Sequence, residues 1–189
     1  MAAQRNDIEE LESAFEEGDL DRVRQMLPSL LKRKSPEAIR IAASFSDAGE
    51  SAEAFDRRYV AGMFEAASLG DIKAQYSVGV FYDLGEYGIE RDLERAAKIF
   101  ESLSLREHPH SMWIHAINLT YGCPGISVDE KRGIGLLVAA AGSGSAEACI
   151  TLAKFHHDGA HGFEKSIKER DRYRALALEY DDTTFDPYA

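Results

Sequence analysis

Apolar residues recur along most of the chain with the spacing of amphipathic helices. In residues 92–104, DLERAAKIFESLS, the side chains of Ala96, Ile99, Phe100 and Leu103 follow an i, i+3, i+4, i+7 pattern, which places them on one face of a helix. Alternation of apolar and polar residues, the pattern that predicts a β-strand, is absent over comparable lengths. The pattern therefore predicts an all-α protein.

The same pattern returns at a fixed interval. The segment AQYSVGVFYDLGEYGI, residues 74–89, aligns with residues 111–126 and then with residues 148–163, each time at an offset of 37, and upstream with residues 38–49 at an offset of 36. The helix that follows also recurs, with a basic residue at Arg58, Arg95 and Arg132. A fixed interval of this length is typical of stacked helical repeats, so each copy is predicted to be a pair of helices.

Small residues mark both the ends and the contacts of these helices. Gly70 and Gly85 are expected to end helices, because glycine enters the left-handed backbone region without steric cost. A different reason applies in mid-helix, where the copies place a small residue at one equivalent position and so predict a close helix contact: Ala43, Gly79, Ala116 and Ala153. Four further positions are candidate helix starts: Ser35 before Pro36, Asp92, Asp129 and Ser145.

The repeats resemble a known family. The segment AQYSVGVFYDLGEYGIERDLERAAKIF, residues 74–100, is similar to the Sel-one-like (Sel1-like) repeat, a relative of the tetratricopeptide repeat. The resemblance implies an α-solenoid of antiparallel helix pairs in a right-handed superhelix, with four repeats at about residues 36–73, 74–110, 111–147 and 148–180. It also implies that the first helices line a concave face that binds peptides or proteins. The two cysteines, Cys123 and Cys149, do not sit where the cysteine-rich branch of the family pairs them.

The ends of the chain lie outside the repeat pattern. Residues 1–35 show helical spacing on either side of Gly18 and are predicted to form a capping helix hairpin, since a solenoid exposes an apolar face at its end unless an atypical unit covers it. Residues 181–189, DDTTFDPYA, form an acidic C-terminal tail that is expected to be frayed.

The net charge of −11 is concentrated at the two ends. Residues 1–20 carry −6 and residues 179–189 carry −4, which leaves −1 for the rest of the chain. Without a basic stripe, nucleic acid is not an expected partner. A basic protein or peptide fits better, and four N-terminal acids are predicted to steer its approach: Glu9, Glu10, Glu16 and Glu17. The sequence has no apolar run long enough to span a membrane and no signal-peptide pattern at its start, so a cytoplasmic location is expected.

Histidines offer the main alternative to a binding function. His156, His157 and His161 could bind zinc or serve a metal- or histidine-dependent enzyme, but helical geometry would point the adjacent pair to different sides, so packed or solvated histidines are the competing interpretation. His115 replaces an aliphatic residue of the repeat and is expected to be partly buried and hydrogen-bonded. Because no nucleophile, base and orienting group can be assembled, we expect neither an enzyme nor a cofactor.

A binding function remains, and it predicts specific contact residues. Tyr76, Trp113 and Ile150 share one equivalent position, and Gln75 and Met112 precede the first two of them; these five are the predicted partner contacts on the concave face. Arg40, at the same position in the first copy, suggests that this position faces water. The alternative is that Tyr76 and Trp113 seal the interface between repeats. Resemblance to bacterial members of the family implies an adaptor, or an immunity protein that neutralises a cognate toxin or effector.

Overall fold

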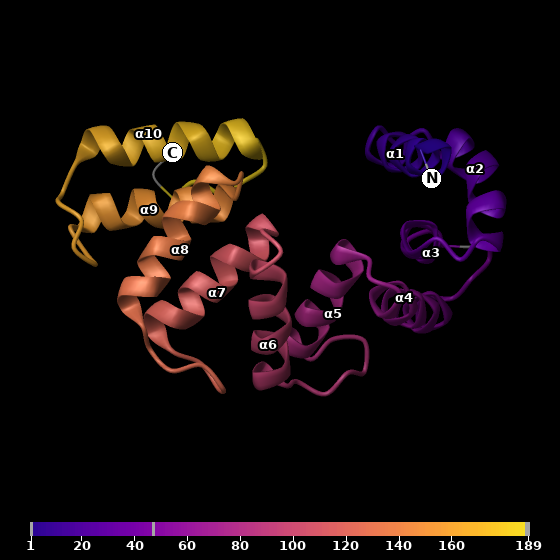
Figure 1. The fold of residues 1–189 in the computed structure, drawn as a ribbon, viewed down its shortest axis with the longest axis horizontal. Coiled ribbons are helices and arrows are strands. Elements are labelled where there is room, and N and C mark those ends of the chain that lie inside the picture. The colour runs from indigo at the N-terminus through magenta and orange to yellow at the C-terminus, as the bar shows by residue number, and fades with distance from the viewer. Residues whose placement is uncertain (1, 47, 188–189) are drawn as a thin grey trace. The chain divides into compact units, whose positions relative to one another are not determined.

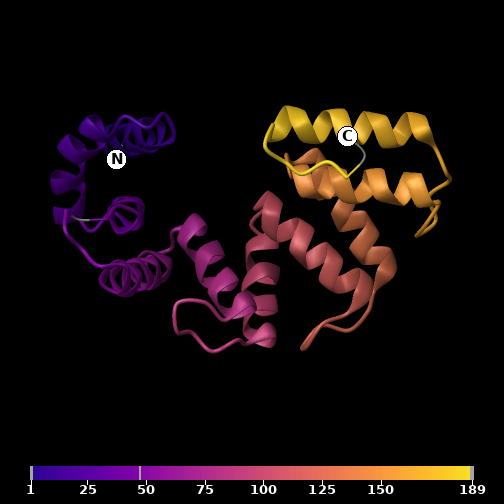
Figure 2. The ribbon, with the colours of Figure 1, turned by 180° about the vertical axis from the view of Figure 1, so that it is seen from behind.

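The computed structural model describes residues 2–46 and 48–187. Within these ranges the regular structure is ten α-helices and one isolated β-bridge between Cys123 and Ile126 (Figures 1 and 2). The prediction of an all-α protein built from helix pairs is confirmed. The chain divides into two compact units, Met1–Arg91 and Asp92–Ala189, and the division lies between the two helices of the expected second repeat.

The first unit contains five helices. They are α1 (Ala2–Glu16), α2 (Leu20–Lys32), α3 (Pro36–Ala43), α4 (Ala52–Ser68) and α5 (Ile72–Leu84). Helices α1 and α2 pack against α3 around a core of Leu11, Ala14, Val23, Leu30, Ala38 and Ile41. Helix α4 then packs against both α3 and α5. The N-terminal hairpin therefore covers the apolar side of the first repeat helix.

The second unit also contains five helices. They are α6 (Leu93–Ser104), α7 (Pro109–Tyr121), α8 (Glu130–Gly142), α9 (Ala146–Asp158) and α10 (Ile167–Tyr180). Helix α7 packs against α6 and α8, and α9 packs against α8 and α10; Figures 1 and 2 both show α9 and α10 side by side. Their core combines small and large side chains: Met112, Ala116, Leu137, Ala140, Ala141, Ala146, Ala148, Cys149, Leu152, Phe155 and Ala177.

Helix ends lie where the sequence predicts them. The side chains of Asp92, Asp129 and Ser145 accept a hydrogen bond from the backbone N–H three residues on, at 2.9, 3.1 and 3.1 Å. Ser35 also precedes a helix that begins with proline, although its hydroxyl donates to Glu37 and does not cap the backbone. Gly85 ends α5 with a φ of +73°, the conformation that favours glycine there.

The predicted small-residue positions lie at helix contacts. Ala43, Gly79, Ala116 and Ala153 are all buried. A side chain at Gly62 of α4 would collide with Ala43 of α3, and a Cβ at Gly133 of α8 would lie 2.8 Å from the carbonyl oxygen of Ala116 on α7. The close contact expected in mid-helix is confirmed for these two helix pairs, and a glycine on the second helix makes it possible.

The C-terminal tail is not frayed over its described part, residues 181–187. Asp186 is folded back against α10, where its carboxylate accepts from Arg174 with a closest separation of 2.6 Å and its side chain is only 6% exposed. The expectation of a frayed tail was wrong because it rested on composition, which does not reveal a single charged partner on the preceding helix. Residues 188 and 189, and residue 1 of the expected hairpin, lie outside the described residues.

Candidate interaction surface

The predicted contact residue Tyr76 lines an open cavity in the first unit. Its other lining residues are Tyr59 of α4, Ser77, Val80 and Phe81 of α5, and Glu86 and Tyr87 of the loop that follows. The cavity has a volume of about 230 Å³. We call it the aromatic pocket, because four of its seven lining residues carry aromatic rings.

The rings of the aromatic pocket meet at steep angles. Tyr59, Phe81 and Tyr87 have ring centroids 5.1–5.7 Å apart and interplanar angles of 60–70°. Tyr59 is further supported by Phe55, which stacks on it at 5.8 Å. Such edge-to-face contacts are favourable between aromatic rings and hold the rings in fixed orientations. Packing among α4, α5 and the loop that follows α5 therefore fixes the walls of the pocket.

The surroundings of the aromatic pocket are acidic. The pKa of Tyr87 is raised, first by partial burial of the phenol and then by the nearby Tyr59, Glu86 and Asp56. Tyr87 also has a φ of +55°, an uncommon value for a residue other than glycine, asparagine or aspartate. That backbone conformation turns the loop at Glu86–Tyr87, where the chain leaves α5.

Three other predicted contact residues, Gln75, Trp113 and Ile150, make contacts within the fold. Gln75 donates its amide to the carbonyl oxygen of Ala67 at 3.0 Å and so ties α5 to α4. Trp113 donates its indole N–H to the hydroxyl of Thr151 on α9 at 3.0 Å, and its ring packs against the core of the second unit. Ile150 packs partly against the same core.

Met112 is a correction to the predicted contact surface. Its side chain is 6% exposed and belongs to the core of the second unit, so it presents no surface to a partner. Sequence spacing placed it next to Trp113 on the same helix, but successive residues of a helix point in directions about 100° apart. The five predicted contact positions thus differ in exposure, and Tyr76 lines an open cavity.

Arg40 is a second correction, because it does not face water. Its side chain is 7% exposed, and its guanidinium forms ion pairs with Glu12 of α1 and with Asp71, the N-cap residue of α5, the latter at 3.1 Å. Lys73 of α5 extends this set of charges, with its ammonium 2.7 Å from Glu12 and 3.0 Å from Glu16. We call these residues, Glu12, Glu16, Arg40, Asp71 and Lys73, the ionic network. It connects α1, α3 and the start of α5.

The four predicted steering acids are thus not equivalent. Glu10 pairs with Arg22 at 2.6 Å, and Glu16 belongs to the ionic network. Glu17 accepts a hydrogen bond from the hydroxyl of Ser13, and both Glu9 and Glu17 are exposed. In the sequence these acids differ only in position, and their charge alone does not reveal which of them hold helices together.

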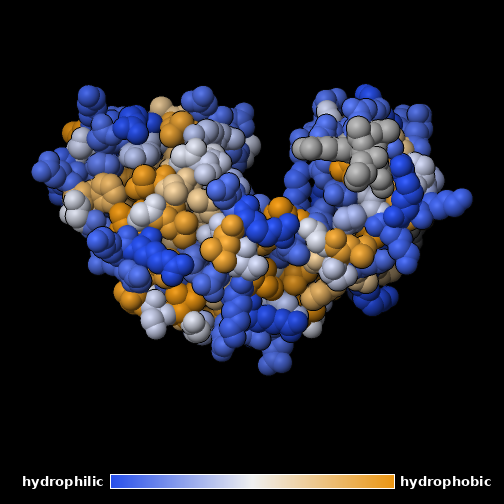
Figure 3. Space-filling view, in the orientation of Figure 1, coloured by the Kyte–Doolittle hydropathy of each residue, from blue (hydrophilic) through white to orange (hydrophobic). Residues whose placement is uncertain are grey.

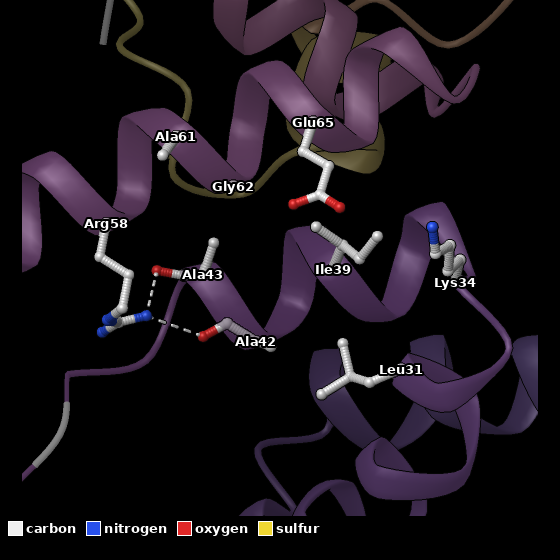
Figure 4. A pocket seen from close by; sticks show the side chains of 9 residues that line it. All are labelled: Leu31, Lys34, Ile39, Ala42, Ala43, Arg58, Ala61, Gly62 and Glu65. Atoms are coloured by element: carbon white, nitrogen blue, oxygen red, sulfur yellow. Dashed lines mark hydrogen bonds between the residues drawn. The ribbon is translucent and has the colours of Figure 1, made fainter.

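A second cavity of the first unit was not expected from the sequence. It has a volume of about 460 Å³ and lies between α2, α3 and α4, with Leu31, Ile39, Ala42, Ala43 and Gly62 among its apolar lining residues. Figure 4 shows Ile39 and the carboxylate of Glu65 pointing toward each other across it. Arg58 closes one end, where it donates to the carbonyl oxygens of Ala42 and Ala43 and pairs with Glu50 at 2.8 Å.

The histidines singled out in the sequence are engaged by different groups. The ring of His156 stacks on Tyr173, with centroids 5.7 Å apart. His161 instead faces Glu130 through Nδ1 at 2.7 Å and the hydroxyl of Tyr121 through Nε2 at 3.0 Å. Within residues 2–46 and 48–187, no group of three or more His, Cys, Asp or Glu side chains is arranged to hold a metal ion.

His115 is buried more completely than expected, at 3% exposure, and the prediction of a hydrogen bond is wrong. Its side chain is among the buried polar groups of α7, and neither ring nitrogen has a partner among the described residues. Burial lowers its pKa; the nearby Arg132 acts in the same direction, and Glu101 acts against both. The neutral imidazole is therefore the form that the folded protein favours.

Comparison with known proteins addresses the fold. No protein-family model and no curated protein matches the sequence. A Sel1 repeat protein from Oxalobacter formigenes has a similar structure, with a TM-score of 0.69 and 18% identity over 93% of this chain and 70% of that one. A protective antigen present in uropathogenic Escherichia coli strains, which displays an SLR fold, gives a TM-score of 0.65 and 16% identity over 83% of this chain. This chain has the Sel1-like repeat fold.

Three of the candidate residues lie on equivalent helices of the Sel1-like fold. Tyr76, Trp113 and Ile150 lie on α5, α7 and α9, the first helices of successive repeats. The chain spans 33% of the length of the E. coli antigen, so that protein extends well beyond the part compared. In the described part of the chain, no helix combines the length and the apolar character needed to cross a membrane.

Proposed function

We propose that this chain is a non-enzymatic interaction module that binds another protein or peptide, as a bacterial adaptor or as an immunity protein for a cognate toxin or effector in the cytoplasm. The observation that carries the proposal is the aromatic pocket at Tyr76, on the first helix of a repeat. Solenoids of helix pairs present extended surfaces that bind other chains. Tyrosine is also among the residues that contribute most to protein interfaces.

The charge of the chain supports a basic protein partner. A net charge of −11 repels nucleic acid and attracts basic surfaces over distances of about 10 Å at moderate salt. Trp113, another predicted contact residue, also stabilises the fold, since its indole N–H donates a hydrogen bond to the hydroxyl of Thr151. We therefore assign the principal contact to the first unit, at Tyr76.

Affinity capture from the native host tests the proposal with a matched pair of variants. Wild-type protein is expected to retain a partner that Tyr76→Ala loses, whereas Tyr180→Ala, which removes a tyrosine that is 40% exposed on α10, should retain it. Circular dichroism confirms that both variants are folded. Equal retention by all three proteins would place the partner elsewhere, and failure of the wild type to retain any protein in stoichiometric amount would contradict the proposal.

A growth assay distinguishes the two roles. If the chain is an immunity protein, expression of the captured partner alone should stop growth of a bacterial host, and co-expression of the chain should restore it. An adaptor role predicts no effect of the partner on growth.

Steering by the N-terminal acids is tested by association kinetics. Replacing exposed Glu9 and Glu17 by glutamine should slow association about threefold at low salt and leave dissociation unchanged, because long-range attraction acts on the encounter. Stopped-flow measurements at several salt concentrations check this. An association rate that is independent of these substitutions would exclude a steering role for Glu9 and Glu17.

A further inference from the structure

We infer that the aromatic pocket receives the cationic end of a lysine or arginine side chain from the partner. The inference rests on the proposed function and specifies which part of the partner occupies the site. Three observations support it: the chemistry of the walls, the charges beside them and the size of the cavity.

The walls have the chemistry that cations prefer. Tyr59, Tyr76, Phe81 and Tyr87 line one cavity, and three of these rings are inclined to one another by 60–70°. The face of an aromatic ring is negative, so a ring whose face borders the cavity would attract an ammonium or guanidinium group. The neighbouring wall already shows such a contact, since the guanidinium of Arg58 lies 5.4 Å from the ring centroid of Phe55.

The charges beside the pocket are of the complementary sign. Glu86 lines the cavity, and Asp56 on α4 acts on Tyr87 electrostatically. Arg58, whose guanidinium lies 5.4 Å from the ring centroid of Phe55, is held by Glu50 and by the backbone carbonyl groups at the end of α3. An entering basic side chain would therefore meet carboxylates whose charge that arginine does not neutralise at the pocket.

The size of the cavity suits one side chain. At about 230 Å³, the cavity is smaller than the roughly 300 Å³ at which pockets for small-molecule ligands begin. A long, unbranched side chain with a terminal charge can place its methylene groups against the rings and its charge near Glu86. A bulkier aromatic side chain would lack that charge complementarity.

Titration with short peptides tests the inference on the full chain. The probes are the capped tripeptides Gly-Lys-Gly and Gly-Arg-Gly, and Gly-norleucine-Gly, which keeps the length of lysine without its charge. NMR should show saturable shifts of Tyr59, Tyr76 and Tyr87 signals, with at least one basic peptide binding fivefold or more tightly than the norleucine peptide. Equal binding of all three, or no shift with any of them, would overturn the inference.

Two variants and a control identify the cause of that preference. Glu86→Gln should weaken binding of the basic peptide about threefold, whereas Glu90→Gln, an exposed acid that does not line the pocket, should leave it unchanged. Tyr87→Leu keeps apolar bulk but removes a ring, and should abolish the preference over norleucine. A preference that survives both pocket substitutions would contradict a cation site formed by these residues.

The peptide titration and the capture experiment can fail independently of each other. If the basic peptides bind but Tyr76→Ala still captures the partner, the pocket accepts cations and the proposed function fails at this site. If capture depends on Tyr76 but the peptides show no preference, the interaction stands and the inferred occupant is wrong.

Discussion

The two units join their helices by different kinds of interaction. In the first unit, the ionic network connects α1, α3 and α5, with Arg40 and Asp71 almost completely buried. In the second unit, the corresponding contacts between successive repeats are mostly apolar, with Trp113 of α7 packed on the core and bonded to Thr151 of α9. Arg40 and Trp113, the central residues of these two sets of contacts, occupy equivalent positions of the repeat in the sequence.

The difference shows how one repeat position can serve two interfaces. Where the neighbour is the next repeat, an aromatic ring fills the space with apolar contact. Where the neighbour is the acidic α1, an arginine fills it and pairs with carboxylates. A buried charge requires its partners, whereas an apolar contact tolerates replacement by another apolar group.

The largest effect that would test this comparison is expected from Arg40→Ala. It leaves Glu12 and Asp71 without their buried cation, which should destabilise the first unit by about 3–5 kcal/mol. Urea unfolding measures the loss, and hydrogen exchange should localise it to residues 6–84. The control is Arg22→Ala, which removes an exposed pair with Glu10 and should change stability little. Similar losses for both arginines would contradict a special role for the ionic network.

The equivalent change in the second unit is Trp113→Ala. Loss of the ring from the core should destabilise that unit by about 3 kcal/mol. Trp113→Phe keeps most of the packing and removes the indole N–H that Thr151 accepts, so its cost should be near 1 kcal/mol. Thermal unfolding of the two variants checks the order. If Trp113→Ala unfolds no more readily than the wild type but loses the partner, Trp113 is a contact residue and not part of the interface between repeats.

Two glycines of α8 sharpen the comparison at the level of helix contacts. Gly133→Ala should destabilise by about 1–3 kcal/mol, because its Cβ would press on the backbone of Ala116 and Thr120. Gly135→Ala, two residues along, has open space and should instead stabilise the helix by up to about 1 kcal/mol. Opposite signs in chemical unfolding are the expected result; stabilisation by both substitutions would mean that α7 and α8 can separate at no cost, and destabilisation by both would mean that Gly135 does not face open space.

The smallest effect concerns His115 and pH. Its folded pKa lies below its unfolded value, so its titration costs the fold no stability above about pH 6.5, and stability falls as the pH drops below that value. His115→Leu removes an unpartnered buried polar group and should stabilise by about 1 kcal/mol at pH 7. Its advantage over the wild type should grow toward pH 5.

The control for that prediction is His110, a second histidine that titrates in the same pH range. Pairing with Glu147 raises the pKa of His110, whose contribution is therefore present below about pH 6.5 and lost as the pH rises. Both proteins carry His110, so it cancels in the difference between variant and wild type. A difference in stability that does not change between pH 7 and pH 5 would show that His115 is not protonated on unfolding.

The fold was predictable because its determinants are local and recur. Helical spacing, N-cap residues such as Asp92 and small residues such as Ala116 act within one or two helices, and the regular interval shows them several times. The ionic network was not predictable, because Glu12 and Arg40 lie 28 residues apart and have no counterpart in the other repeats. Likewise, nothing in the spacing indicated that Tyr87, in a loop, would join Tyr59 and Tyr76 around one cavity.

The ionic network also constrains how the protein could change in length. A helix pair duplicated next to α9 would meet another apolar repeat face and could be accommodated by the same kind of packing. Insertion of a pair between α2 and α3 would instead separate Glu12 from Arg40 and Lys73, and remove one of the two acids that pair with the buried Arg40. Growth by repeat duplication is therefore tolerated within the second unit and destabilising next to the N-terminal hairpin.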